Sequence, residues 1–115
     1  MFFERKKWLQ SFKTNRAIII DMLSTIPFDF KKVNKKDLDN ELLRFGMIAE
    51  LDAVNLYEQM AAMAENPDLK KVFLDIAKEE KTHAGEFQTL LLRSDKEQVE
   101  ENEHAKKEIK DLTGK

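Results

Sequence analysis

Apolar side chains recur every three or four residues in three stretches of the chain, which is the period of helices that bury one face. The first stretch is rich in Leu, Glu, Met and Ala, the strong helix formers. Asn34 offers an N-cap before it, and Asn66 followed by Pro67 ends it and starts the next helix, because proline fits a first helical turn. The helices predicted in this way cover residues 35–65, 67–93 and 96–112.

The third predicted helix is short and polar. Ser94 or Asp95 supplies its N-cap, and Gly114 supplies a stop after it. The chain has only 3 Gly and 2 Pro, too few for the turns of a β-sandwich. The predicted fold class is therefore all-α, with an antiparallel two-helix hairpin and a C-terminal helix over residues 34–115.

Both hairpin helices carry a heptad-like apolar stripe that ionisable side chains interrupt at its middle. The stripe on the first helix comprises Leu43, Met47, Glu50, Val54, Tyr57 and Ala61. The stripe on the second helix comprises Phe73, Ile76, Glu80, His83, Phe87 and Leu90. We expect each stripe to face a partner helix, which places Glu50, Glu80 and His83 in an apolar contact.

The interrupting side chains are predicted to lie at one level of the hairpin. Glu50 lies sixteen residues before Asn66 and Glu80 lies fourteen residues after it. At a rise of 1.5 Å per residue, both therefore sit roughly 21–24 Å from the turn. Glu80 and His83 are three residues apart and share one helix face. The three side chains should converge.

A carboxylate in an apolar contact is costly unless a cation compensates its charge, and carboxylates with imidazole suit iron, manganese or zinc. One Glu on a helix and Glu-x-x-His on its neighbour form half of the ligand set of di-iron carboxylate bundles. We therefore expect a homodimer, a four-helix bundle whose four carboxylates balance two divalent ions. The residue types alone leave iron, manganese and zinc open.

Taken singly, the candidate residues also have simpler interpretations. His83 alone could be a hydrogen-bonded core histidine, and Glu50 alone could reach water at the edge of the contact. Tyr57 either hydrogen-bonds a ligand or fills the core. Asp52 lies off the stripe on an acidic face, and His104 lies in a polar helix. The metal hypothesis depends on the shared level of the first three residues.

The length and the lack of cysteine exclude several classes of protein. A chain of 115 residues makes one domain, and without Cys it has no disulfide framework, thiolate metal site or cysteine nucleophile. No apolar run approaches the roughly 20 residues needed to cross a bilayer.

The net charge of −2 conceals a division along the chain. Residues 1–36 carry nine basic and three acidic side chains, whereas residues 37–115 carry eleven and nineteen. The acidic part repels nucleic acid and attracts cations, so we expect no nucleic-acid partner.

The first 33 residues are predicted to be a basic arm and connector separate from the helical domain. Residues 1–21 are basic with interspersed aromatics, and residues 22–33 contain Pro27 and no helical period. A disordered arm, and a true start at Met22, are the two interpretations that we favour. The third is an amphipathic helix that lies on a membrane or a partner.

Two segments resemble the encapsulated ferritins, short ferritin-like proteins housed in encapsulin nanocompartments. These segments are residues 49–60 (AELDAVNLYEQM) and 79–87 (EEKTHAGEF). The similarity extends from about residue 22 to residue 112, and the tail EIKDLTG at 108–114 fits as well.

This resemblance implies a ferroxidase, which oxidises Fe(II) with dioxygen at a di-iron centre formed across a homodimer interface and feeds iron mineral storage inside an encapsulin shell. By position, Glu50, Glu80 and His83 match the iron ligands, Tyr57 matches a tyrosine beside the centre, and Asp52 matches an acidic residue of the metal access path. Ala49 departs from members that place a second access carboxylate there.

The resemblance also implies partners and a location. Dimers of the family assemble through the tail helix, typically into a ring of ten, in a cytoplasmic nanocompartment. Some members are fused to the shell protein, and this chain could be such a domain. Two other functions stay open: a rubrerythrin-like di-iron peroxidase, although the lack of Cys removes the usual electron-delivery domain, and a metal-free helical adaptor.

Overall fold

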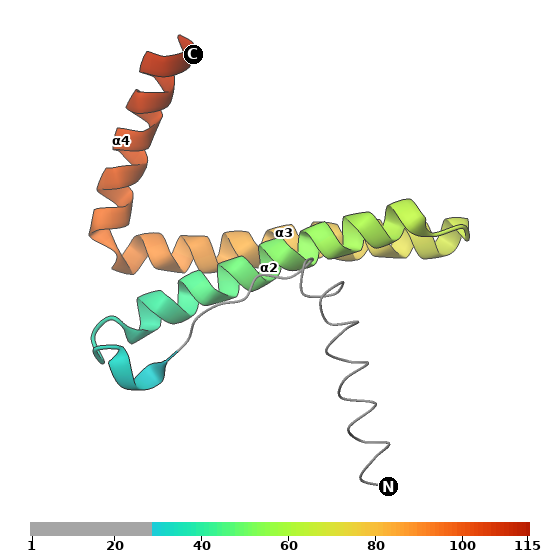
Figure 1. The fold of residues 1–115 in the computed structure, drawn as a ribbon, viewed down its shortest axis with the longest axis horizontal. Helices are drawn as coiled ribbons and strands as arrows, with labels where there is room; N and C mark the ends of the chain where they lie inside the picture. Colours follow the sequence, from blue (N-terminus) through green and yellow to red (C-terminus); the bar gives the residue numbers. More distant parts are fainter. Residues whose placement is uncertain (1–28) are drawn as a thin grey trace, which may run out of the picture.

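The computed structural model describes residues 29–115, which form three α-helices and one short 3-10 turn, with no strand among them. The elements are η1 (Phe30–Lys32), α2 (Leu38–Met63), α3 (Pro67–Ser94) and α4 (Lys96–Thr113). Helices α2 and α3 run antiparallel and side by side, and α4 leaves the end of α3 at a steep angle (Figure 1). The all-α class, the hairpin and the tail helix were thus predicted correctly.

The turn of the hairpin is closed by the predicted cap. The Asn66 side chain accepts hydrogen bonds from the backbone N–H groups of Asp68 (2.8 Å) and Leu69 (3.3 Å). These are two of the donors that a helix leaves unpaired at its start, and Pro67 removes a third. The chain therefore reverses at a defined residue, which fixes the register of α3 against α2.

The start of α2 differs from the prediction. Asn34 does not cap the helix; its carbonyl accepts a hydrogen bond from the N–H of Asp37 (2.9 Å), which closes a turn before the helix. Helix α2 begins at Leu38, with Asp37 as the N-cap residue. Residues 30–32 form the 3-10 turn η1 where an extended connector was predicted. The expected arm lies largely in residues 1–28, outside the described part of the chain, and its boundary at 33 stays a prediction.

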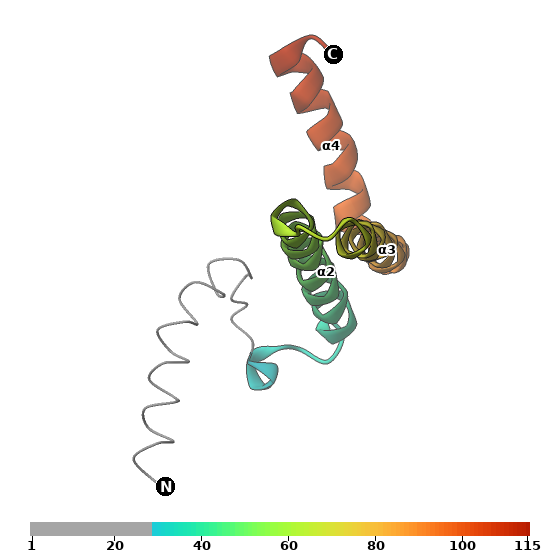
Figure 2. The ribbon, with the colours of Figure 1, turned by 90° about the vertical axis from the view of Figure 1, so that its right-hand side faces the viewer.

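Asp95 joins α3 to α4, and it rather than Ser94 is the N-cap of α4. Its Oδ1 accepts from the backbone N–H of Gln98 (3.0 Å), and its Oδ2 pairs with the Arg44 guanidinium of α2 (3.3 Å). The α4 helix then projects from the hairpin (Figure 2) and ends at Gly114, whose φ of 77° is the left-handed conformation of a helix C-cap.

The buried line of α3 is displaced by one residue from the predicted stripe. The buried apolar side chains of the hairpin are Val54, Ala61, Ala77, Ala84 and Leu91. The prediction put Ile76, His83 and Leu90 on this line instead. Within one copy, small alanines, not the bulkier residues beside them, occupy the buried contact between the helices. Ile76, His83 and Leu90, spaced seven residues apart, form the row of α3 beside the buried one, and His83 and Leu90 are exposed.

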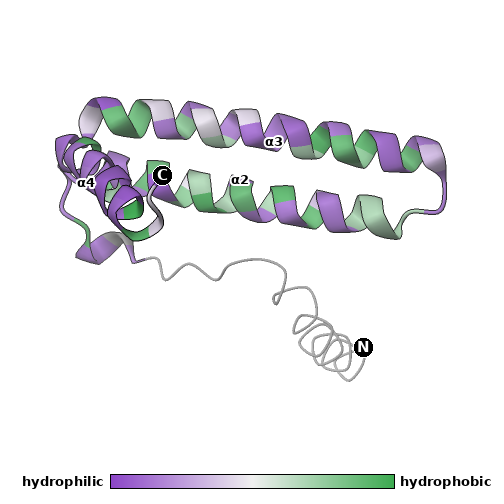
Figure 3. Cartoon of the chain, turned by 90° about the horizontal axis from the view of Figure 1, so that it is seen from above, coloured by the Kyte–Doolittle hydropathy of each residue, from purple (hydrophilic) through white to green (hydrophobic). Residues whose placement is uncertain are grey.

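The hairpin has a thin core and much exposed apolar surface. No large side chain among residues 29–115 is fully buried, and hydrophobic positions are interspersed with hydrophilic ones along both α2 and α3 (Figure 3). Three apolar residues of α4 are exposed in this chain: Val99, Ile109 and Leu112. A lone copy thus leaves apolar surface available for further packing.

Candidate metal centre

The three predicted ligands lie at the middle of the two longest helices. Glu50 is on α2, and Glu80 and His83 are on α3, one turn apart. Because both helices are continuous through these positions, the three side chains project from rigid backbone rather than from loops. The predicted agreement in level along the hairpin is confirmed.

The side chains converge on one point. His83 Nδ1 lies 3.6 Å from Glu50 Oε2 and 3.4 Å from Glu80 Oε2. One ligand atom from each residue lies within 4.8 Å of those of the other two. Among residues 29–115 this is the one group of at least three acidic or histidine side chains that could hold a metal ion. The site is therefore a preformed set of two carboxylates and an imidazole.

The cluster is open on one side. The side chains of Glu50 and Glu80 are 21% and 18% exposed, whereas that of His83 is 48% exposed. Glu80 lies one turn from the buried Ala77 and Ala84 on α3, and Glu50 lies one turn from the buried Val54 on α2. Two mostly buried carboxylates with ligand atoms within 4.8 Å of each other repel when both are charged, and a divalent cation between them relieves the repulsion.

Tyr57 and Asp52 lie outside the cluster. Tyr57 lies two turns along α2 from Glu50, and its ring packs against Phe73 at a centroid distance of 6.2 Å, tilted by 32°. Asp52 is two residues from Glu50 and therefore on another face of α2. The structure does not bring either residue into the converging group, so their roles in catalysis and in metal access stay predictions.

A close contact between Gly46 and Phe87, beside the cluster, was not predicted from the sequence. Gly46 lies one turn before Glu50, and a Cβ added there would lie 3.0 Å from the ring of Phe87. Glycine inside a helix costs about 1 kcal/mol relative to alanine. A glycine in the middle of an otherwise strong helix is the signal that could have found this contact.

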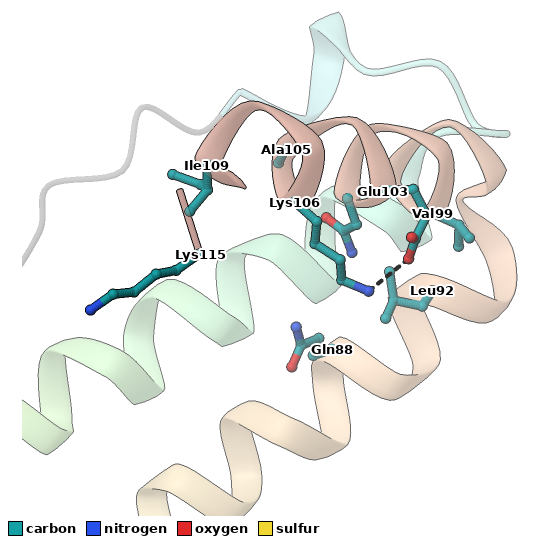
Figure 4. A pocket seen from close by; sticks show the side chains of 9 residues that line it. Gln88, Leu92, Val99, Glu103, Ala105, Lys106, Ile109 and Lys115 are labelled. Carbon is teal, nitrogen blue, oxygen red and sulfur yellow. Dashed lines mark hydrogen bonds and ion pairs between the residues drawn. The ribbon is translucent and has the colours of Figure 1, made fainter. Parts of the chain in front are cut away.

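A separate hollow of about 730 Å³ lies between α3 and α4 (Figure 4). Its one carboxylate, Glu103, is paired with Lys106 at 2.7 Å. His104, also on α4, is exposed as predicted and pairs only with Glu101 in the same helix. This hollow therefore does not coincide with the candidate metal ligands, which lie on the hairpin. None of the described helices is long and apolar enough to cross a membrane.

Comparison with known proteins supports the reading of the two motifs. The Rubrerythrin family profile matches residues 41–113. A ferritin-like-encapsulin shell fusion protein of Pyrococcus furiosus is 52% identical over 84 residues, which cover 73% of this chain and 24% of that protein. The encapsulin nanocompartment cargo protein EncC of Myxococcus xanthus is 37% identical over 91 residues, covering 76% of this chain and 67% of that protein. The chain thus spans about a quarter of the fusion protein.

The fold agrees with a solved structure. The crystal structure of the encapsulated ferritin domain from Pyrococcus furiosus superposes with a TM-score of 0.67 and 45% sequence identity. The superposition covers 79% of this chain and 98% of that one. The profile spans more than half of the chain, and the two relatives and the solved structure confirm the resemblance drawn from residues 49–60 and 79–87. The chain belongs to the rubrerythrin family, among its encapsulated ferritins.

Proposed function

We propose that this chain is a ferroxidase subunit that oxidises Fe(II) to Fe(III) with dioxygen at a di-iron centre shared between two copies. The observation that carries the proposal is the convergence of Glu50, Glu80 and His83 on the open edge of the hairpin. The substrate is ferrous iron, and two ions together supply the two electrons that reduce one dioxygen to hydrogen peroxide with two protons.

The donor set fits this substrate. Each copy offers two carboxylates and one imidazole, so two copies offer a charge of −4 to two divalent ions, if the imidazoles are neutral. We assign Glu80 the role of bridging the two ions or holding one closely. Glu50 completes the carboxylate ligands, and His83 gives each ion a nitrogen. The protein supplies position and charge, and the metal ions transfer the electrons.

A second copy is part of the proposal because one copy supplies only half of a di-iron ligand set. The exposed side of the cluster also carries an apolar residue. Leu90 is 48% exposed and lies two turns from His83 on the same helix face. A twin related by a two-fold axis would cover this edge and bring the second set of ligands opposite the first. The four helices would then form a ferritin-like bundle.

The relatives support a place inside an encapsulin shell. One is named as a cargo protein of an encapsulin nanocompartment and the other as a fusion with the shell. We propose that this domain delivers Fe(III) to mineral stored in such a shell, as cargo or by fusion. The exposed apolar residues of α4 are consistent with assembly of dimers into a ring.

A di-iron peroxidase is the second candidate, because the family profile is that of rubrerythrin. Stopped-flow oxidation of the Fe(II)-loaded chain by dioxygen and by hydrogen peroxide separates the two functions. We expect fast oxidation by dioxygen, with about one molecule consumed per two Fe(II). Oxidation by peroxide alone would favour the peroxidase. A chain that neither binds Fe(II) without oxygen nor gains thermal stability from it would be a metal-free adaptor.

A further inference from the structure

Next to the candidate metal centre, the aromatic ring of Phe87 lies close to the backbone of Gly46. A Cβ built on Gly46 of α2 would lie 3.0 Å from both Cδ2 and Cε2 of Phe87 on α3, and 3.3 Å from its Cζ. Carbon atoms in contact normally lie about 3.5–4.0 Å apart. The edge of the Phe87 ring therefore lies closer to position 46 than a side chain there would normally allow.

This contact lies directly beside the ligands. Gly46 is one turn before Glu50 on α2, and Phe87 is one turn after His83 on α3. On the other side of the ligands the rings of Tyr57 and Phe73 meet at 6.2 Å. The ligands thus lie between two aromatic contacts, and the nearer one rests on a glycine.

We propose that Gly46 and Phe87 form a spacer that sets the separation of α2 and α3 at the ligands and so positions Glu50 against Glu80 and His83. Neither spacer residue binds metal; both are positioning residues. The inference rests on the proposed function, because it assigns the spacer to the metal centre of that function.

The size of the contact explains why the spacer matters for metal binding. An alanine at position 46 would need the ring or the helix to move by about 0.5 Å to reach normal carbon contact. Metal sites require ligand distances within about 0.2 Å of their preferred values. The spacer proposal holds that the helices make this movement, since the Phe87 ring lies between them, and a helix shift of this size is larger than the metal site tolerates.

The hairpin contains its own control. Gly85 also lies inside a long helix, on α3, and a Cβ added there meets no atom within 4 Å. Gly85→Ala adds the same methyl group and the same gain in helix propensity as Gly46→Ala, without an overlap. A difference between the two variants therefore reports the contact with Phe87 rather than the loss of a glycine.

The test is a titration of the full chain with Co(II) alone, followed by the visible spectrum of the bound ion. We expect Gly85→Ala to bind within about twofold of the unmodified chain and to give the same spectrum, and Gly46→Ala to bind about tenfold more weakly with an altered spectrum. Adding Phe87→Leu to Gly46→Ala removes the ring edge, so binding should recover to within about threefold.

Two results would overturn the spacer: Gly46→Ala binding Co(II) with unchanged affinity and spectrum, or the double variant staying as weak as the single one. If Gly46→Ala does not fold, the test uses the double variant of Gly46→Ala with Phe87→Leu. A double variant that folds and binds Co(II) supports the spacer, and a double variant that fails to fold or to bind Co(II) contradicts it. If the unmodified chain itself binds no Co(II), the proposed metal centre fails, which is a different outcome from failure of the spacer.

Discussion

Glu80→Ala is expected to abolish Fe(II) oxidation and to weaken the association of two copies. The Glu80 carboxylate lies in the cluster at 3.4 Å from His83 and is only 18% exposed. Its removal takes two of the four carboxylates from the proposed shared centre, so the remaining charge would no longer balance two divalent ions. Because metal binding and association are linked, losing one weakens the other.

The measurement combines stopped-flow oxidation with sedimentation of the Fe(II)-loaded chain under nitrogen. We expect the oxidation rate to fall at least about 100-fold and metal-dependent dimer formation to disappear. Glu79→Ala is the control, because Glu79 is the neighbouring exposed residue and is absent from the cluster. Oxidation by Glu80→Ala at the unmodified rate would remove Glu80 from the centre.

Leu90→Lys is expected to abolish metal retention although it leaves all three ligands in place. Leu90 lies two turns from His83 on the same face of α3 and is 48% exposed, beside the open side of the cluster. A lysine there places a charge in the proposed contact between copies, where desolvation makes it costly. Glu50, Glu80 and His83 of one copy would stay in place, but they would lack the second set of ligands from a partner copy.

Leu74→Lys is the matched control for this variant. Leu74 is on the same helix and is 47% exposed, but it lies nine residues from His83 and so on the opposite side of α3. Native mass spectrometry with Fe(II) under nitrogen should detect a metal-loaded dimer for Leu74→Lys and a metal-poor monomer for Leu90→Lys. A loaded dimer in both variants would mean that copies do not meet at this edge.

The convergence of the ligands could be predicted from the sequence because it follows from regular helix geometry. The rise per residue and the position of Asn66 fix the levels of Glu50 and Glu80, and the spacing of three places His83 on the face of Glu80. The Asn66 cap is made as expected. The ligand positions and the Asn66 cap could be predicted because each depends only on the period of one helix or on one turn.

The exact contact face of α3 could not be predicted in the same way. Phe73, Glu80 and Phe87 are compatible with either flanking row, and hydrophobicity favoured Ile76 and Leu90 over alanine. The structure chooses the row of Ala77 and Ala84 because close approach of two helices depends on side-chain volume at the contact. Volume matching between two helices is not encoded in the period of either one.

This displacement has a consequence for the site. Because alanines occupy the buried contact, His83 lies beside that contact rather than in it, and its side chain is about half exposed. The ligands therefore do not form a closed pocket within one chain: His83 is exposed on the open side of the cluster, and the two carboxylates are mostly covered. A set of ligands that is open on one side, with an apolar border, is the geometry that a symmetric partner can complete.

The most direct test of the shared centre is a crystal grown with Fe(II) under nitrogen and measured at the iron absorption edge. The anomalous map should contain two iron peaks on a two-fold axis or related by it, between two copies, each within bonding distance of carboxylate oxygens and of His83 from one copy. Iron bound within a single copy, or no iron at Glu50, Glu80 and His83, would contradict the shared centre.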